Sequence, residues 1–67
     1  MKKSQIMKIA MRVRMYRGLH KMTQSEFGLI FGVSQRTIWN LENGDWDEMS
    51  EGLILSIQQY IGNGVLK

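Results

Sequence analysis

Hydrophobic residues recur every three to four positions along most of this chain of 67 residues, with polar residues between them. That spacing puts the hydrophobic side chains on one face of an α-helix. The pattern predicts four helices, at about residues 4–17, 24–32, 35–43 and 49–61. Their expected inward positions are, in chain order, Ile6, Ile9 or Ala10, Val13 and Tyr16; Phe27 and Ile30 or Phe31; Ile38 and Leu41; Leu53, Ile54, Ile57, Tyr60 and Ile61.

Residues 11–15 allow a different interpretation, because apolar and basic residues alternate there as they do in a β-strand. The Met, Arg, Lys and Ala content favours a helix, and nothing nearby signals a hairpin. The chain also lacks proline and internal repeats. We therefore expect one all-α domain over residues 1–67, a small bundle of four or five helices.

Small residues mark the corner between the second and third predicted helices. Gly32 falls at a helix end, where glycine adopts a left-handed conformation without a Cβ penalty, and Val33 fills the corner. Ser34 is a good N-cap for the next helix, and Gly44 stops that helix. Gly28 falls where the two helices would cross closest; alanine would also fit there, whereas leucine would push the helices apart.

Other helix ends follow from single residues. Ser4 and Thr23 are expected to cap the first and second helices, and residues 18–22 connect them. An acidic loop at residues 45–48 leads into the last helix, whose first turn is weakened by Gly52.

Composition limits the kind of protein. A chain of this size buries only about 60% of its unfolded surface, so a partner subunit would add stability. No cysteine is present, which fits a reducing compartment. The basic N-terminus is not followed by a signal sequence, because Lys8, Arg12 and Arg14 interrupt the apolar residues, and no apolar run approaches the about 18 residues that span a membrane. We expect a cytoplasmic protein without a membrane partner.

Charge is distributed unevenly. Residues 1–41 carry eight basic residues and one acidic residue, a net charge of +7, whereas residues 42–67 carry one basic and five acidic residues, a net charge of −4. A polyanion would therefore meet the first part of the chain and avoid the second.

One set of residues lies in register on both sides of the predicted corner: Thr23, Gln24, Phe27, Gly28, Gly32, Val33, Ile38, Leu41, Glu42, Asn43 and Gly44. This set resembles the helix-turn-helix of the phage-repressor and Cro family, also called XRE-type. The resemblance implies a lambda-repressor-like DNA-binding domain with its helix-turn-helix at about residues 24–43. It also implies a transcriptional regulator, by family habit a repressor, acting as a homodimer on a palindromic double-stranded DNA operator.

Polar side chains that the core does not use predict base contacts. Gln35, Arg36, Trp39 and Asn40 lie opposite the inward positions of the third helix, on the side that would enter the major groove. Arg36 can donate two hydrogen bonds to guanine, and the two amides can pair with adenine. The resemblance adds Ser34 to the base-reading positions.

Two alternatives remain open on this face. The polar residues could simply be solvated, as exposed polar residues usually are. Trp39 could touch a thymine methyl group or a sugar, or it could fold back over the acidic loop or Met49.

Phosphate contacts need hydrogen-bond donors at helix ends. Gln24 begins its helix, where the side-chain amide and free backbone N–H groups could hold a phosphate oxygen; in the family, glutamine at this position does so. Thr37 and Asn43 are second candidates, and Lys21 and Arg14 add longer-range attraction.

The resemblance implies a structural role for Arg17. In relatives, the arginine seven residues before the opening glutamine pairs with the glutamate that corresponds to Glu42. Such a pair would connect the first helix to the third.

Relatives usually add a fifth helix that forms the dimer contact, and the end of this chain leaves little room for one. Residues 62–64 signal a turn. An alternative dimer surface would use Leu55, Tyr60, Val65 and Leu66.

Enzymatic function finds little support, since His20 is the only histidine and no cysteine or carboxylate cluster accompanies it. We expect no cofactor, metal or small-molecule ligand. Alternative hypotheses are an antitoxin or restriction-modification controller with the same fold, or a coactivator-like module that binds proteins instead of bases.

Overall fold

The computed structural model describes residues 2–47 and 49–62. Within these ranges the chain forms four α-helices and no strand, which confirms the expected all-α architecture: α1 (Lys3–His20), α2 (Gln24–Phe31), α3 (Gln35–Glu42) and α4 (Glu51–Ile61). None of these helices is both long and apolar enough to cross a membrane. Any fifth helix, the turn expected after Gly62, and Val65 and Leu66 lie outside the described residues.

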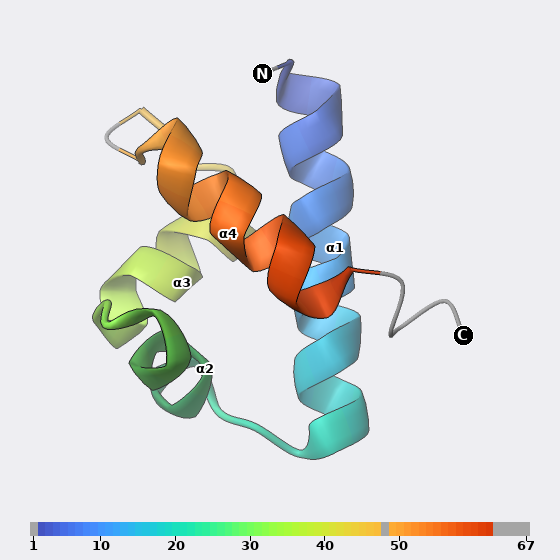
Figure 1. The fold of residues 1–67 in the computed structure, drawn as a ribbon, viewed down its shortest axis with the longest axis vertical. Helices are drawn as coiled ribbons and strands as arrows, with labels where there is room; N and C mark the ends of the chain where they lie inside the picture. The colour runs from blue at the N-terminus through green and yellow to red at the C-terminus, as the bar shows by residue number, and fades with distance from the viewer. Residues whose placement is uncertain (1, 48, 63–67) are drawn as a thin grey trace.

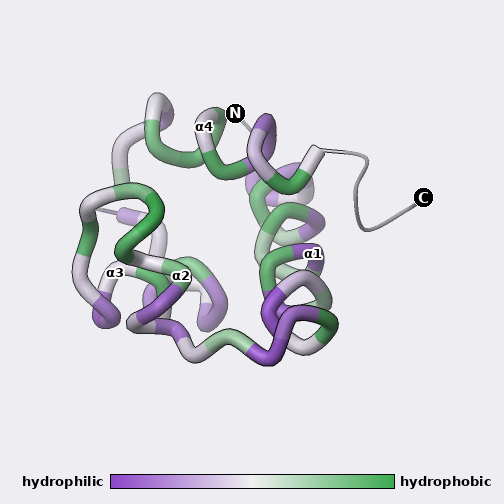
Figure 2. Tube along the Cα trace, turned by 60° about the horizontal axis from the view of Figure 1, so that its bottom comes forward, coloured by the Kyte–Doolittle hydropathy of each residue, from purple (hydrophilic) through white to green (hydrophobic). Residues whose placement is uncertain are grey.

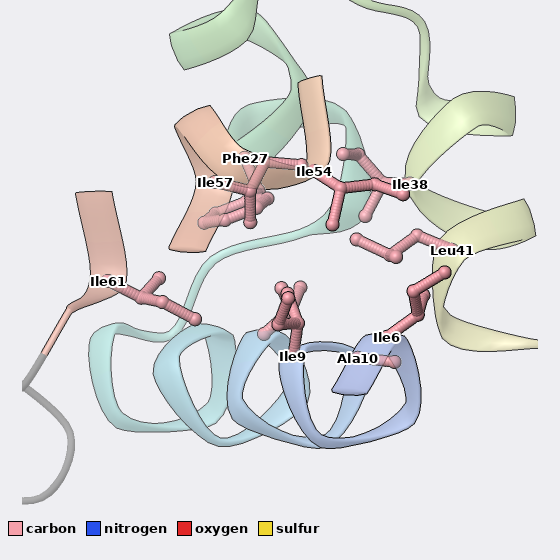
Figure 3. Close-up of a cluster of buried hydrophobic side chains, with 10 residues drawn as sticks. Ile6, Ile9, Ala10, Phe27, Ile38, Leu41, Ile54, Ile57 and Ile61 are labelled. Carbon is pink, nitrogen blue, oxygen red and sulfur yellow. The ribbon is translucent and has the colours of Figure 1, made fainter. Parts of the chain in front are cut away.

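The helices enclose a single hydrophobic core. α1 stands along one side of the molecule, α2 and α3 lie together on the other, and α4 crosses α1 (Figure 1). Figure 3 shows inward side chains from all four helices meeting in one cluster. The buried hydrophobic residues are Ile6, Ile9, Ala10, Val13, Phe27, Ile38, Leu41, Ile54, Ile57 and Ile61.

The expected inward positions are confirmed except for Tyr60, and two open alternatives are settled. Both Ile9 and Ala10 are buried, so α1 uses the two alternatives together. On α2 the inward residue after Phe27 is Phe31, because Ile30 is 39% exposed. Tyr60 does not belong to the core as expected, since nearly half of its surface is exposed.

Tyr60 instead forms part of an aromatic cluster at the edge of the core. Its ring meets Tyr16 and Phe31 edge-on, with centroids 5.7 and 5.4 Å away. The Tyr16 and Tyr60 hydroxyl groups are 3.4 Å apart, and this hydrogen bond raises the pKa of Tyr16 above its ordinary value. The cluster therefore joins α1 and α2 to α4.

The helix ends around the corner between α2 and α3 form at the expected residues. Gly32 ends α2 in the left-handed conformation, with φ of 69°. The Val33 N–H then donates to the Gly28 carbonyl at 3.0 Å. Thr23 caps α2 through the Glu26 N–H, and Ser34 caps α3 through the Thr37 N–H.

Gly28 is more restricted than the sequence suggests. A Cβ atom at this position would lie 2.7 Å from the Val33 carbonyl oxygen and 3.3 Å from that of Ser34. Both are backbone atoms of the corner, so neither can rotate away. The expectation that alanine would fit here is wrong.

Helix boundaries also differ from the prediction, and three of these differences have a local cause. α1 continues through Gly18 to His20, because the left-handed conformation that ends it falls on Lys21, with φ of 52°. Ser4 lies inside α1 instead of capping it; the Lys2 N–H at the cap position donates to Gln5 Oε1. α4 begins at Glu51, two residues late, because Ser50 caps it by accepting from the Leu53 N–H.

Trp46 is a structural residue that the hydrophobic pattern of the sequence does not indicate. Its ring packs against the core, and its indole N–H donates to the Leu41 carbonyl oxygen at 2.8 Å. That carbonyl is in the last turn of α3, where it lacks a partner within the helix. Trp46 therefore both covers the core and satisfies the end of α3.

Candidate nucleic-acid interface

α3 leaves one side uncovered, because its aliphatic residues turn inward. Ile38 and Leu41 are completely buried, whereas the residues at the start of α3 are exposed. Asn40 is half-buried, and Trp39 keeps 42% of its surface exposed. We call this side the α3 outer face; it is formed by Ser34, Gln35, Arg36, Trp39 and Asn40.

Arg36 lies at the centre of this face and is held by two neighbours. Its Nε donates to Asn40 Oδ1 at 3.3 Å, one helical turn further on. Its guanidinium carbon lies 5.5 Å from the centre of the Trp39 ring, within range of a cation–π contact. The Trp39 ring thus supports Arg36, and the outer Nη groups of the guanidinium are left to meet a ligand.

The two glutamines that begin α2 and α3 are in direct contact. Gln35 Nε2 donates to Gln24 Oε1, and Gln24 Nε2 donates in turn to Glu42 Oε1 at 3.3 Å. The chain of bonds runs from the exposed face to a buried carboxylate. Gln24 and Gln35 therefore hold each other in one arrangement at the positions where phosphate and base contacts are expected.

Glu42 is the buried anchor beneath this arrangement. Its side chain is 2% exposed and accepts two hydrogen bonds of 2.7 Å from Arg17. These bonds raise the pKa of Arg17 above its ordinary value, although burial acts in the opposite direction. Arg17 also donates to the Met22 carbonyl, so the pair ties α1 and the connection before α2 to the end of α3.

Arg14 turns toward Glu42 as well. Its Nη2 donates to the Glu42 carbonyl at 3.1 Å, and its Nε lies 3.5 Å from Glu42 Oε1. The side chain is nonetheless 58% exposed. Arg14 is therefore already partnered at the position from which it was expected to attract phosphate.

The remaining phosphate candidates are placed differently. Thr37 is half-buried, with its hydroxyl 3.3 Å from that of Ser34. Asn43 Nδ2 donates to the Trp39 carbonyl at 2.8 Å, and the same carbonyl accepts from the Asn43 backbone N–H at 2.9 Å. Lys21 is exposed in the connection before α2.

Acidic residues border the α3 outer face, which the sequence did not indicate. An open hollow of about 490 Å³ is lined by Arg36, Thr37 and Asn40 on α3 and by Asp45, Asp47 and Met49 from the following loop. The Asp45 N–H donates to the Asn40 carbonyl, which brings the loop back beside α3. Basic and acidic side chains from the two parts of the chain thus line one hollow.

Other chemistry has few groups to use. In the part of the chain that the structure describes, no group of three or more His, Cys, Asp or Glu residues could hold a metal ion. His20 is exposed and its ring lies 4.2 Å from that of Tyr16.

Comparison with known proteins adds no assignment. No protein-family model matches the chain, and no curated protein or solved structure matches it.

Proposed function

We propose that this chain is a sequence-specific regulator that binds double-stranded DNA, with α3 lying in the major groove. The observation that carries the proposal is the α3 outer face: a row of polar donors on a short helix whose opposite side is fully buried. A helix that presents such a row can read the hydrogen-bonding pattern of base edges. The resemblance to phage-repressor helix-turn-helix proteins supports the same conclusion.

Arg36 is the main base-reading residue in this proposal. Its guanidinium can donate to guanine O6 and N7, a contact that discriminates between bases by about 1–3 kcal/mol. The neighbouring Asn40 and Trp39 hold it in one direction. A donor held in place in advance loses less conformational freedom on binding.

Gln35 is the second base-reading residue, and Gln24 is its partner on the phosphate side. Their hydrogen bond fixes the distance between a base-edge contact and a backbone contact. The exposed Lys21 and the backbone N–H groups at the start of α2 extend the phosphate contact.

A homodimer acting as a repressor completes the proposal. One domain with an eight-residue reading helix contacts only a few base pairs, so two copies on half-sites about one helical turn apart would supply the required affinity. Repression would follow from blocking the polymerase at such an operator.

The test is selection of binding sites from a pool of random duplexes, followed by anisotropy titration of the selected duplex and a scrambled one. We expect Arg36→Ala to lose about tenfold or more in affinity for the selected duplex only. Arg12→Ala removes an equal charge from α1 and should leave the preference intact. Affinity should fall for every protein as salt rises.

Two results would count against base reading. One is failure of the selection to enrich any sequence. The other is equal loss of affinity for both duplexes in Arg36→Ala, which would reduce this residue to a general phosphate contact.

A further inference from the structure

α1 carries a second apolar surface that the fold does not use. Three methionines and a leucine follow one another at intervals of four residues, and each has between 50% and 67% of its surface exposed. Residues at this interval are neighbours on one side of a helix. We call this row the α1 outer stripe; it consists of Met7, Met11, Met15 and Leu19.

The stripe lies on the side of α1 turned away from the core. Ile6, Ile9 and Ala10 point from α1 into the cluster formed with the other helices (Figure 3). α1 is therefore apolar on two sides, and Figure 2 shows hydrophobic and hydrophilic positions alternating along it. A helix that serves only to close a core has no need of the second apolar side.

A hollow opens directly beside the stripe. It has a volume of about 330 Å³ and a mainly apolar lining, with Met7 and Met11 on one wall. Gly44 and Trp46, which follow the end of α3, also line it, as do Ala10, Arg14 and Glu42. An apolar side chain from outside could enter it while its neighbours lie along the stripe.

The charged side chains that border the stripe on α1 are all basic. Lys8 and Arg12 stand three residues before Met11 and Met15, so they border the stripe along one edge. α1 contains no Asp or Glu. The one carboxylate at the hollow belongs to Glu42, which is buried and paired with Arg17, so it does not oppose an incoming acidic group.

We propose that the α1 outer stripe and its hollow bind an acidic amphipathic helix of another protein. Apolar residues of that helix would lie on the stripe, with one of them in the hollow, and its Asp or Glu residues would face Lys8 and Arg12. The stripe from Met7 to Leu19 is about 18 Å long, which matches about three turns of helix.

Other occupants fit less well. A second copy that paired α1 with α1 would place Lys8 and Arg12 of both copies together, which is unfavourable. Membrane-surface helices use Trp, Phe and Leu for their apolar side, whereas this stripe is mostly Met, whose flexible side chain suits surfaces that adapt to a bound helix. The surface lies on α1, so this proposal does not depend on DNA binding by α3.

The test uses the full chain and two labelled synthetic peptides of about 18 residues. Both peptides carry Leu at the same positions, spaced so that the leucines lie on one side of a helix. The other positions are Ala and Glu in the first peptide and Ala and Lys in the second. Anisotropy titration should show binding of the Glu peptide and none of the Lys peptide. Met11→Gln should weaken binding about tenfold or more.

Two further variants make the result specific. Leu29→Gln changes an exposed leucine on α2, and it should leave peptide binding unchanged. The double variant Lys8→Glu with Arg12→Glu should lose the Glu peptide and bind the Lys peptide, a reversal that loss of folding cannot produce. Circular dichroism verifies that each variant keeps its helices.

Several outcomes would overturn the proposal. These are equal binding of the two peptides, absence of binding by either, or binding that Met11→Gln does not change. Self-association in sedimentation velocity that Met11→Gln abolishes would assign the stripe to a second copy. Binding to phosphatidylserine vesicles without binding to the Glu peptide would assign it to a membrane surface.

Discussion

Gly28 and Gly18 both lie inside helices, yet a methyl group added to each would meet different surroundings. At Gly28 the added carbon would press on backbone oxygens of the corner, whereas at Gly18 nothing lies within 4 Å. The first glycine permits the close approach of α2 and α3. The second only adds conformational freedom to the unfolded chain.

These two glycines give a matched pair of substitutions. Gly28→Ala should lower the free energy of unfolding by about 1–3 kcal/mol, because the corner must move to make room. Gly18→Ala should raise it by about 0.5–1 kcal/mol. Urea denaturation followed by circular dichroism measures both, and an unchanged stability in Gly28→Ala would show that the corner yields easily.

The sequence could indicate that Gly28 stands where two helices cross, because its neighbours follow helical spacing. It could not indicate that alanine is excluded. That exclusion depends on the position of the Val33 carbonyl, which the turn between the helices fixes in three dimensions.

Helices α1, α2 and α3 are connected through one carboxylate. Glu42 receives hydrogen bonds from Arg14 and Arg17 on α1 through its backbone and side-chain oxygens, and from Gln24 on α2. A buried carboxylate requires such partners. Removing its negative charge would leave the Arg17 guanidinium with a weaker hydrogen-bond partner.

We therefore expect Glu42→Gln to lower the free energy of unfolding by about 2–3 kcal/mol. Glu26→Gln makes the same chemical change at an exposed N3 position, where glutamine also completes a capping box, and should stay within about 0.5 kcal/mol of the parent chain. Thermal or urea unfolding compares the two. Equal effects would mean that the buried pair adds no net stability.

At the scale of the helices, the sequence predicts that each described helix exists, but it does not predict every helix end. Thr23 and Ser34 are unambiguous caps, because a side-chain oxygen precedes a periodic apolar run. α1 passes its expected end because a lysine adopts the left-handed conformation, which residue preferences place on glycine instead. Local preference did not decide that boundary.

The whole molecule brings together charges that the chain keeps apart. Asp45 and Asp47 share a hollow with Arg36, although a count along the sequence separates a basic part from an acidic part. Two carboxylates beside the α3 outer face would repel phosphates that approach in the wrong register. In the proposed complex with DNA, they would thereby favour specific over general binding.

Neutralising both carboxylates tests this effect. The double variant Asp45→Asn with Asp47→Asn should increase affinity for the scrambled duplex several-fold. The ratio of its affinities for a selected and a scrambled duplex should therefore become smaller. Ser56→Lys with Gln59→Lys adds the same net charge on exposed positions of α4 and serves as the control. Anisotropy titrations should show a smaller increase for the control; an equal increase would assign the effect to net charge alone.

The two tryptophans are intrinsic fluorescent probes that report on two different events. Trp46 has its indole bonded within the fold, while Trp39 stands in solvent beside a guanidinium. Their intrinsic fluorescence should accordingly differ in wavelength, the enclosed indole emitting further to the blue. Unfolding would shift the blue component and a bound duplex would quench the red one, so a single unlabelled sample could follow both events.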